Sequence, residues 1–388
     1  MSRFFNRRQA LGLAGWLGLA AATSSFAAGG PRKLKDVVRS RTFDVHAHLV
    51  PPAWFGRGGQ RPRKLSRDQW IKELASNPYI VVPDAAAIVD ARLPELEAFE
   101  AARAGGSVEA SAAVLIAEMD RAGIDTSICM LMDELNRPFR RVATVSIESM
   151  LSDVQRMAAL YPGRIVNFFG VDPRRGAGGV ALLRRSVEEF GVCGMGEWLT
   201  HRWGVSPDDR ERSYPYLEAC VDLGIPYANN GSGPDPTHSI AVFSNVLRDF
   251  PKLKMVHAAA GVMTEQELRE DPSRIKLSTE LLRLSERNAN FYLDMDDWQR
   301  LDLPGQRRAL TFLRRALDGP ARDRIMFGTD FPVFTQVMNA RDWVGVFVDR
   351  AAGLGVRFRN SELEAFFSRN ALRFLTGPRM PAFLGSGR

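Results

Sequence analysis

The chain has 388 residues, of which 45% are apolar, and a formal net charge of +7. This apolar content is enough for a large core, and the small, evenly spread charge argues against a protein that binds nucleic acid. The three cysteines, Cys129, Cys193 and Cys220, lie in apolar contexts, so we expect buried free thiols and no disulfide framework.

The N-terminus has the pattern of an export signal. Arg7 and Arg8 directly precede an apolar run, and small residues allow cleavage after Ala27. The run is too short for a stable membrane span, and the arginine pair resembles a twin-arginine signal. We therefore expect an export signal over residues 1–27, a mature chain of residues 28–388 with no membrane span, and a periplasmic location. An ordinary secretory leader and an uncleaved anchor are the alternatives.

Two histidines end the first predicted strand. The run "RTFDVHAH" carries His46 and His48, which are separated by one residue. Alternate residues of a β-strand point to the same face, so we expect both imidazoles to face one side. They are either a pair of metal ligands or two polar side chains at the end of a strand.

Residues 50–118 form an unusually long connection between the first and second predicted strands. They include a basic segment with Arg57, Arg61 and Arg63 among glycines and prolines. A loop of this length in a compact domain is usually functional or disordered. Because it follows His48, we expect a cap or insertion over the site, in which Arg57 and Arg61 bind a substrate carboxylate. A solvated basic loop is the alternative.

Short β-rich runs alternate with amphipathic helical patterns over the rest of the chain. Eight runs in this arrangement predict an α/β fold, the (β/α)₈ TIM-like barrel. Polar residues gather at the C-terminal ends of the runs, where such barrels carry their active sites. These residues are His46, His48, Glu197, Asn230, His257, Asp294, Asp296 and Asp330.

The segments "FDVHAH", "MDRAGID", "YPGRIVNFFGVDP", "RIMFGTDFP" and "FFSRNALRFLTG" occur in this order along the chain. They resemble landmarks of the amidohydrolase-related branch of the amidohydrolase superfamily. That branch includes metal-dependent hydrolases and non-oxidative decarboxylases of the aminocarboxymuconate-semialdehyde type. The resemblance covers nearly the whole mature chain, and it implies a barrel that holds a divalent metal ion.

The resemblance also implies roles for individual residues. His46 and His48 correspond to ligands of a divalent ion, most commonly Zn²⁺. Asp330, in "GTDFP", corresponds to the residue that touches the metal and transfers a proton. Glu197 ends the fourth predicted strand, where related barrels place a bridging ligand. It is either a further metal ligand or the partner of Arg202 in an ion pair.

The fifth and sixth predicted strands depart from the family pattern. Asn230 stands where relatives place a histidine ligand, and we assign it to substrate binding. Ala259 occupies the usual position of the strand-six histidine. His257, two residues earlier, is then either the catalytic histidine or a satisfied core residue. His238, in the loop after the fifth strand, is another candidate substitute.

Three functional interpretations follow. The leading one is a metal-dependent hydrolase that acts on a C–O or C–N bond of a small organic acid, amide or lactone. The second is a non-oxidative decarboxylase, which the basic segment supports. The third is an exported binding protein with a degenerate metal site. The expected partner is a small molecule, a carboxylate if the basic segment binds it, and the sequence leaves a homo-oligomer open.

Overall fold

The computed structural model describes residues 31–49, 65–76, 84–104, 107–133, 146–230, 239–261, 275–300 and 302–384. The expected export signal lies outside the described residues, as do Arg57, Arg61, Arg63 and His238 and the side chain of Arg202. The description below concerns the unit that begins at Lys33. No helix in the described part of the chain is both long enough and apolar enough to cross a membrane.

The described residues contain eight parallel strands, which form a barrel. The strands are β1 (Phe43–Ala47), β2 (Thr126–Met132), β3 (Ile165–Gly170), β4 (Met195–Leu199), β5 (Tyr227–Asn230), β6 (Met255–His257), β7 (Phe291–Asp294) and β8 (Ile325–Met326). One ladder runs from β1 to β3 and a second from β4 to β8. Backbone hydrogen bonds join the two ladders at both seams. Phe169 N–H donates to the Gly194 carbonyl at 3.0 Å, and Val45 N–H donates to the Phe327 carbonyl at 2.9 Å. The predicted (β/α)₈ barrel is confirmed.

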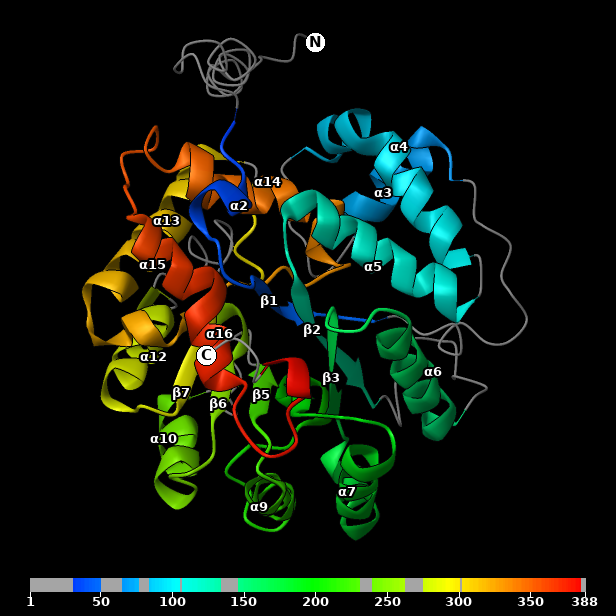
Figure 1. Ribbon diagram of the computed structural model, residues 1–388, viewed down its shortest axis with the longest axis vertical. Coiled ribbons are helices and arrows are strands. Elements are labelled where there is room, and N and C mark those ends of the chain that lie inside the picture. The colour runs from blue at the N-terminus through cyan, green and yellow to red at the C-terminus, as the bar shows by residue number, and fades with distance from the viewer. Residues whose placement is uncertain are drawn as a thin grey trace, which may run out of the picture. The chain divides into compact units, whose positions relative to one another are not determined.

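Helices follow the strands and surround them (Figure 1). The helices are α2 (Leu34–Val37), α3 (Arg67–Ala75), α4 (Ala85–Ala104), α5 (Val108–Ala122), α6 (Ile147–Leu160), α7 (Ala177–Glu189), α8 (Thr200–Trp203), α9 (Tyr214–Leu223), α10 (Ile240–Asp249), α12 (Ile275–Arg287), α13 (Leu303–Asp318), α14 (Ala340–Gly345), α15 (Asn360–Glu364) and α16 (Asn370–Phe374). The side chains of Ser146, Ser239 and Asp302 accept backbone N–H groups at the start of α6, α10 and α13, which fixes where these helices begin.

Two hydrophobic layers follow the alternation of side chains along the strands. The inner layer fills the barrel and contains Phe43, Val45, Ile128, Met130, Val166, Phe168, Ala228, Val256, Tyr292 and Met326. It also includes Phe374 of α16, which therefore covers the end of the barrel where the strands begin. The outer layer lies between the strands and the surrounding helices and includes Met255, Phe291 and Phe243. All three cysteines are free and buried, as expected.

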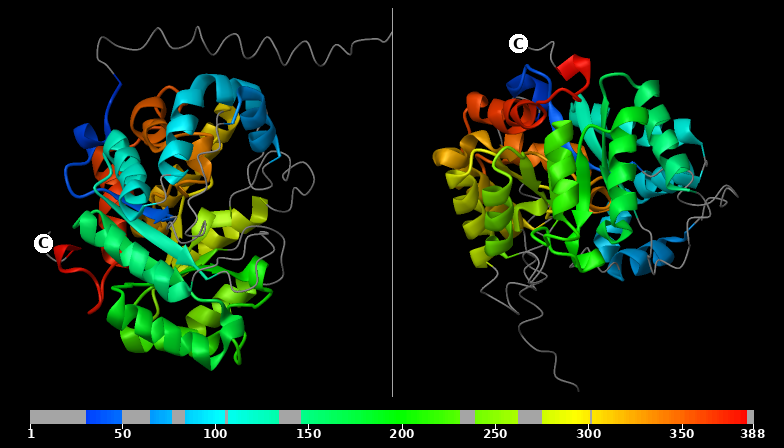
Figure 2. Two further views of the ribbon diagram at one scale, coloured as in Figure 1. Left: turned by 90° about the vertical axis from the view of Figure 1, so that its right-hand side faces the viewer. Right: turned by 90° about the horizontal axis from the view of Figure 1, so that it is seen from below.

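Helices α3 and α4 are additional to the strand–helix alternation. Trp70 and Leu74 of α3 and Val89 of α4 pack against Phe334 and Val337, which follow β8. Figure 2 shows, in its right-hand view, α3 at one end of the strands and the C-terminal helices at the other. The described part of the insertion therefore lies at the end of the barrel where the strands finish. Its role as a cap stays a prediction, because the basic segment is outside the described residues.

Candidate metal centre

Strand β1 carries His46, and His48 follows directly after the end of the strand at Ala47. Its pairing with β2 shifts register between Asp44 and Ala47, which marks a β-bulge. The bulge explains how the consecutive residues Val45 and His46 both lie inside the barrel. His48 follows on the same face, and both imidazoles are buried. The pair therefore faces the space enclosed by the other strands.

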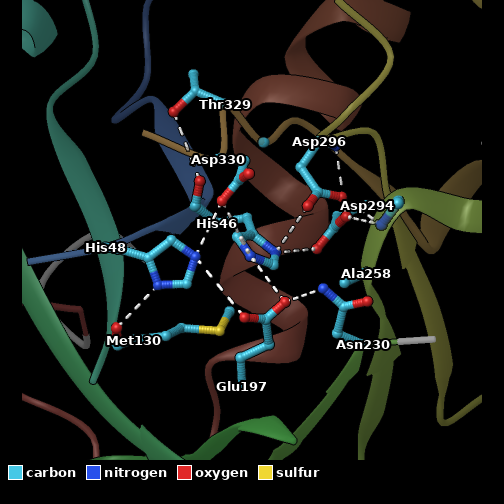
Figure 3. Close-up of polar contacts among 12 residues, drawn as sticks. His46, His48, Met130, Glu197, Asn230, Ala258, Asp294, Asp296, Thr329 and Asp330 are labelled. Atoms are coloured by element: carbon cyan, nitrogen blue, oxygen red, sulfur yellow. Dashed lines mark hydrogen bonds and ion pairs between the residues drawn. The ribbon is translucent and has the colours of Figure 1, made fainter. Parts of the chain in front are cut away.

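Both ring Nδ1 atoms are held by oxygen atoms of the barrel wall (Figure 3). His46 Nδ1 lies 3.3 Å from Asp294 Oδ2 and 3.2 Å from Asp296 Oδ2. His48 Nδ1 lies 3.0 Å from the Met130 carbonyl oxygen. Since a carbonyl or carboxylate oxygen accepts, each Nδ1 donates its proton, and each Nε2 is the atom that can bind a metal ion in place of a proton. Metal-binding histidines are oriented in the same way, by an oxygen that accepts from the other ring nitrogen.

The two Nε2 atoms face the carboxylates of Glu197 and Asp330. His48 Nε2 is 2.9 Å from Asp330 Oδ1 and 3.8 Å from Glu197 Oε2. His46 Nε2 is 3.6 Å from Glu197 Oε1 and 3.9 Å from Asp330 Oδ1. Zinc binds these donor types at about 2.0–2.2 Å, so two ligands of one ion lie at most about 4.3 Å apart. The donor atoms of His46, His48 and Glu197 lie within 4.8 Å of one another, and so do those of His46, Asp296 and Asp330. The described residues therefore offer two overlapping donor groups that share His46.

A buried nitrogen supports the same assignment. His46 Nε2 is enclosed and has no hydrogen-bond partner among the described residues. A buried polar atom without a partner is costly and calls for an explanation, and a bound cation beside the surrounding carboxylates is one. The residues present therefore fit a divalent cation.

The charges around His46 and His48 also favour a bound cation. Burial alone lowers the pKa of His46, but the hydrogen bond to Asp294 and the charges of Asp294, Glu197 and Asp330 raise it to about 10. Burial likewise opposes protonation of His48, and Asp330 nevertheless raises the pKa of that ring. Buried carboxylates thus surround the imidazoles and require a positive charge, which a metal ion can supply.

Asn230 reaches the cluster through Glu197. Its side-chain Nδ2 donates to Glu197 Oε1, which holds this carboxylate from the side of β5. The substrate-binding role of Asn230 stays a prediction. The alternative partner for Glu197, Arg202, has a side chain outside the described residues.

The structure does not bring His257 to the cluster. His257 and Ala259 do not lie on one strand face, because β6 ends at His257 and Ala259 adopts a positive φ of 59°. The His257 ring instead packs edge-on against Phe243 of α10, with ring centroids 5.0 Å apart. Burial there lowers the pKa of His257 to about 4. His257 is a neutral imidazole in the outer layer, and we leave it out of the proposed chemistry.

Residues 43–376 match a protein family described as amidohydrolase. The chain belongs to this amidohydrolase family. No curated protein sequence matches the chain significantly.

Solved structures share the fold of this amidohydrolase. An uncharacterised TIM-barrel protein from Bordetella bronchiseptica is 22% identical over 89% of this chain and all of its own, with a TM-score of 0.51. An amidohydrolase from Burkholderia multivorans is 16% identical over 87% of this chain and 100% of its own, with a TM-score of 0.52. A 5-carboxyvanillate decarboxylase from Novosphingobium aromaticivorans, complexed with manganese and a nitrobenzoic acid, is 14% identical over 90% of this chain and 99% of its own, with a TM-score of 0.51.

Further residues of this amidohydrolase contact the side chains of the site and help to fix their positions. Asp294 and Asp296 hold His46, and Ala259 N–H donates to Asp294 Oδ1 at 2.8 Å. In the sequence, the two aspartates have the same strand parity at the end of a predicted strand, and this pattern could have identified them. Asp44 and Thr329 were missed. Asp44 lies two residues before His46, which was the available hint, whereas only the closed barrel reveals its pairing with Thr329.

Proposed function

We propose that this amidohydrolase is a divalent-metal-dependent hydrolase that cleaves a C–O or C–N bond in a small, uncharged acyl compound. The observation that carries the proposal is the position of Asp330. Its Oδ1 lies 2.9 Å from His48 Nε2, and its side chain is 13% exposed, against 4% for Glu197. Asp330 can therefore contact both the metal position and a substrate that enters from the open side.

His46, His48, Glu197 and Asp330 are the residues that would hold the ion. A bound divalent ion supplies Lewis acidity, which polarises a carbonyl group and makes water acidic near neutral pH. The carboxylate of Asp330 accepts the proton of the attacking water and then delivers it to the leaving group. Two imidazoles with two carboxylates suit Zn²⁺, which is the ion we propose, and they also tolerate Mn²⁺.

Negative charge around the site favours an uncharged substrate. Burial and the neighbouring charge of Asp294 raise the pKa of Asp296 well above its usual value. Burial and the charge of Asp330 do the same for Asp297. These two groups therefore hold their protons near neutral pH, and the negative charge that acts on His46 is that of Asp294, Glu197 and Asp330. An anionic acid would approach against this field, whereas an ester, amide or lactone would not.

Decarboxylation of a small acid is the second candidate. One protein of the same fold is a 5-carboxyvanillate decarboxylase complexed with manganese and a nitrobenzoic acid. If Arg57 and Arg61 of the basic segment face the site, their charges would offset the carboxylates and bind an acidic substrate.

Metal content and product analysis test the proposal. We expect the purified protein to carry a divalent metal, to lose activity with a chelator, and to regain it with Zn²⁺ or Mn²⁺. A panel of uncharged esters, amides and lactones should then be hydrolysed, while aromatic carboxylic acids should release no CO₂. Release of CO₂ without hydrolysis would favour the decarboxylase, and a protein that binds no metal would favour the non-catalytic binding protein.

A further inference from the structure

Asp44 and Thr329 form a buried polar pair at the seam where β8 meets β1. Both side chains are buried, and the contacts of neither include the four side chains that face the metal position. A buried carboxylate needs compensating donors, and its location within a protein therefore calls for an explanation. The explanation offered here rests on the metal site of the proposed function.

The contacts of Asp44 join two strands. Asp44 Oδ1 accepts the backbone N–H of His46 at 3.1 Å and the backbone N–H of Thr329 at 3.1 Å. Its Oδ2 accepts the hydroxyl of Thr329 at 2.6 Å. Asp44 lies two residues before His46, and Thr329 lies directly before Asp330. One carboxylate thus connects the strand that carries His46 and leads into His48 with the turn that carries Asp330.

The turn after β8 needs such support. Asp330 adopts a φ of 46°, in the left-handed region that costs a non-glycine residue about 1–2 kcal/mol. Its N–H donates to the His46 carbonyl at 2.8 Å. Gln299 Nε2 donates to the Thr329 carbonyl at 2.7 Å. Trp343 Nε1 donates to the Gly328 carbonyl at 3.0 Å. The backbone of the turn is therefore held on several sides.

The same turn packs directly on a ligand. A Cβ atom placed on Gly328 would lie 3.0 Å from His46 Cβ and 3.1 Å from Asp296 Cβ. A small shift of the turn therefore changes both the position of Asp330 and the packing of the His46 ring. Of the side chains that hold the turn, Asp44 is the one that also belongs to β1.

We propose that Asp44 and Thr329 are positioning residues that set the spacing between the histidine ligands and Asp330. Through them the β8 turn keeps Asp330 Oδ1 at its short separation from His48 Nε2. Loss of the clamp, defined here as the Asp44–Thr329 pair, changes metal affinity and coordination geometry more than it changes the stability of the barrel.

Thr329→Val is the main test, because it keeps the shape of the side chain and removes the hydroxyl. We expect its affinity for Zn²⁺, measured by competition with a chromogenic chelator, to fall about 10–100-fold, the usual cost of losing a group that orients a ligand. The visible spectrum of the Co²⁺-loaded protein should shift, since it reports coordination geometry. Thr329→Ser, which restores the hydroxyl, should restore both readouts.

Thr126→Val is the matched control. Thr126 is also fully buried, and its hydroxyl donates to the Gly163 carbonyl at 2.7 Å, at the start of β2 and away from the site. We expect both valine variants to lose similar free energy of unfolding, and only Thr329→Val to lose metal affinity. In a double-mutant cycle, Asp44→Asn should add little to Thr329→Val, because the two residues act as one unit.

Two results would overturn the inference. One is a Thr329→Val variant that binds Zn²⁺ as tightly as the wild type while it loses stability as Thr126→Val does. The other is a wild-type protein that binds neither Zn²⁺ nor Co²⁺, which would overturn the proposed function as well. Altered metal affinity in a protein that hydrolyses none of the acyl compounds would support the clamp and contradict only the proposed reaction.

Discussion

His46 and His257 are both buried histidines on the strands of one barrel, yet their surroundings differ completely. His46 lies inside the barrel beside Asp294 and Asp296, and the nearby carboxylates raise its pKa to about 10. His257 lies in the outer layer against Phe243, and burial lowers its pKa to about 4. Burial alone therefore does not identify a ligand. The strand face and the carboxylates that the ring faces do.

The two sides of the site also differ in the side chains that their strands provide. The donors come from β1, β4 and the turn after β8, and they face one another over short distances. Strands β5 and β6, where the family pattern places histidines, provide Asn230 and a helical turn that starts at Ala258. As a proposed ligand, Glu197 would supply a carboxylate in place of a strand-five histidine. The site is therefore richer in carboxylates, so it suits Mn²⁺ as well as the proposed Zn²⁺.

Among substitutions at the metal site, Asp330→Asn should have the largest effect on activity. The amide keeps the size of the side chain but removes both the charge and the proton acceptor. We expect the barrel to remain folded, metal binding to weaken, and kcat to fall by a factor of about 10²–10⁴, the usual contribution of a general base. Steady-state kinetics at saturating metal measure the effect.

Asp318→Asn is the control for this substitution. Asp318 is an exposed acid at the end of α13, and its loss should leave both metal affinity and kcat unchanged. If Asp330→Asn instead kept full activity with added Zn²⁺, Asp330 would not be the proton acceptor.

Asn230→Ala should have a smaller effect on the same site. The variant removes the hydrogen bond that Asn230 donates to Glu197, and hydrogen bonds to charged groups typically contribute about 1.5–3 kcal/mol. We expect metal affinity to fall roughly 10–100-fold because Glu197 is less well oriented. Isothermal titration with Zn²⁺ measures the change. Unchanged metal affinity with a raised KM would instead assign Asn230 to the substrate alone.

Much of this arrangement follows from local patterns in the sequence. Strand and helix alternation predicts the barrel, and the ends of the runs predict where His46, His48, Glu197 and Asp330 gather. These predictions depend only on strand parity and on the geometry shared by parallel barrels. The metal-ligand roles remain predictions, which the observed geometry fits.

The features that could not be predicted depend on where regular structure stops. The bulge in β1 places Val45 and His46 on one side, against simple alternation. The end of β6 at His257, followed by the left-handed Ala259, breaks the parity that connected His257 with the ligand position. The bond between Asp44 and Thr329 joins residues far apart in the sequence and requires the closed barrel. Such irregularities follow from tertiary packing, which no local pattern shows.

The last prediction concerns His257 and the pH dependence of the free energy of unfolding. The folded-state pKa of His257, about 4, lies below the value of 6.5 for an unperturbed histidine. The unfolded chain therefore binds a proton first as the pH falls, so stability is full above about pH 6.5 and is lost as the pH falls toward 4. Between pH 7 and pH 5 this group alone should lower the free energy of unfolding by about 2 kcal/mol.

His257→Gln cannot be protonated, and its urea unfolding curves should show a correspondingly smaller loss of the free energy of unfolding over that pH range. The difference between the two pH profiles isolates His257 from the acidic residues, which both proteins share. Metal affinity of the variant at pH 7 should equal that of the wild type, because the ring lies on the opposite face of β6 from the site. Parallel pH profiles would show that burial does not lower the pKa of His257, and a variant that no longer binds Zn²⁺ would place His257 with the metal ligands; either result would remove the contrast with His46.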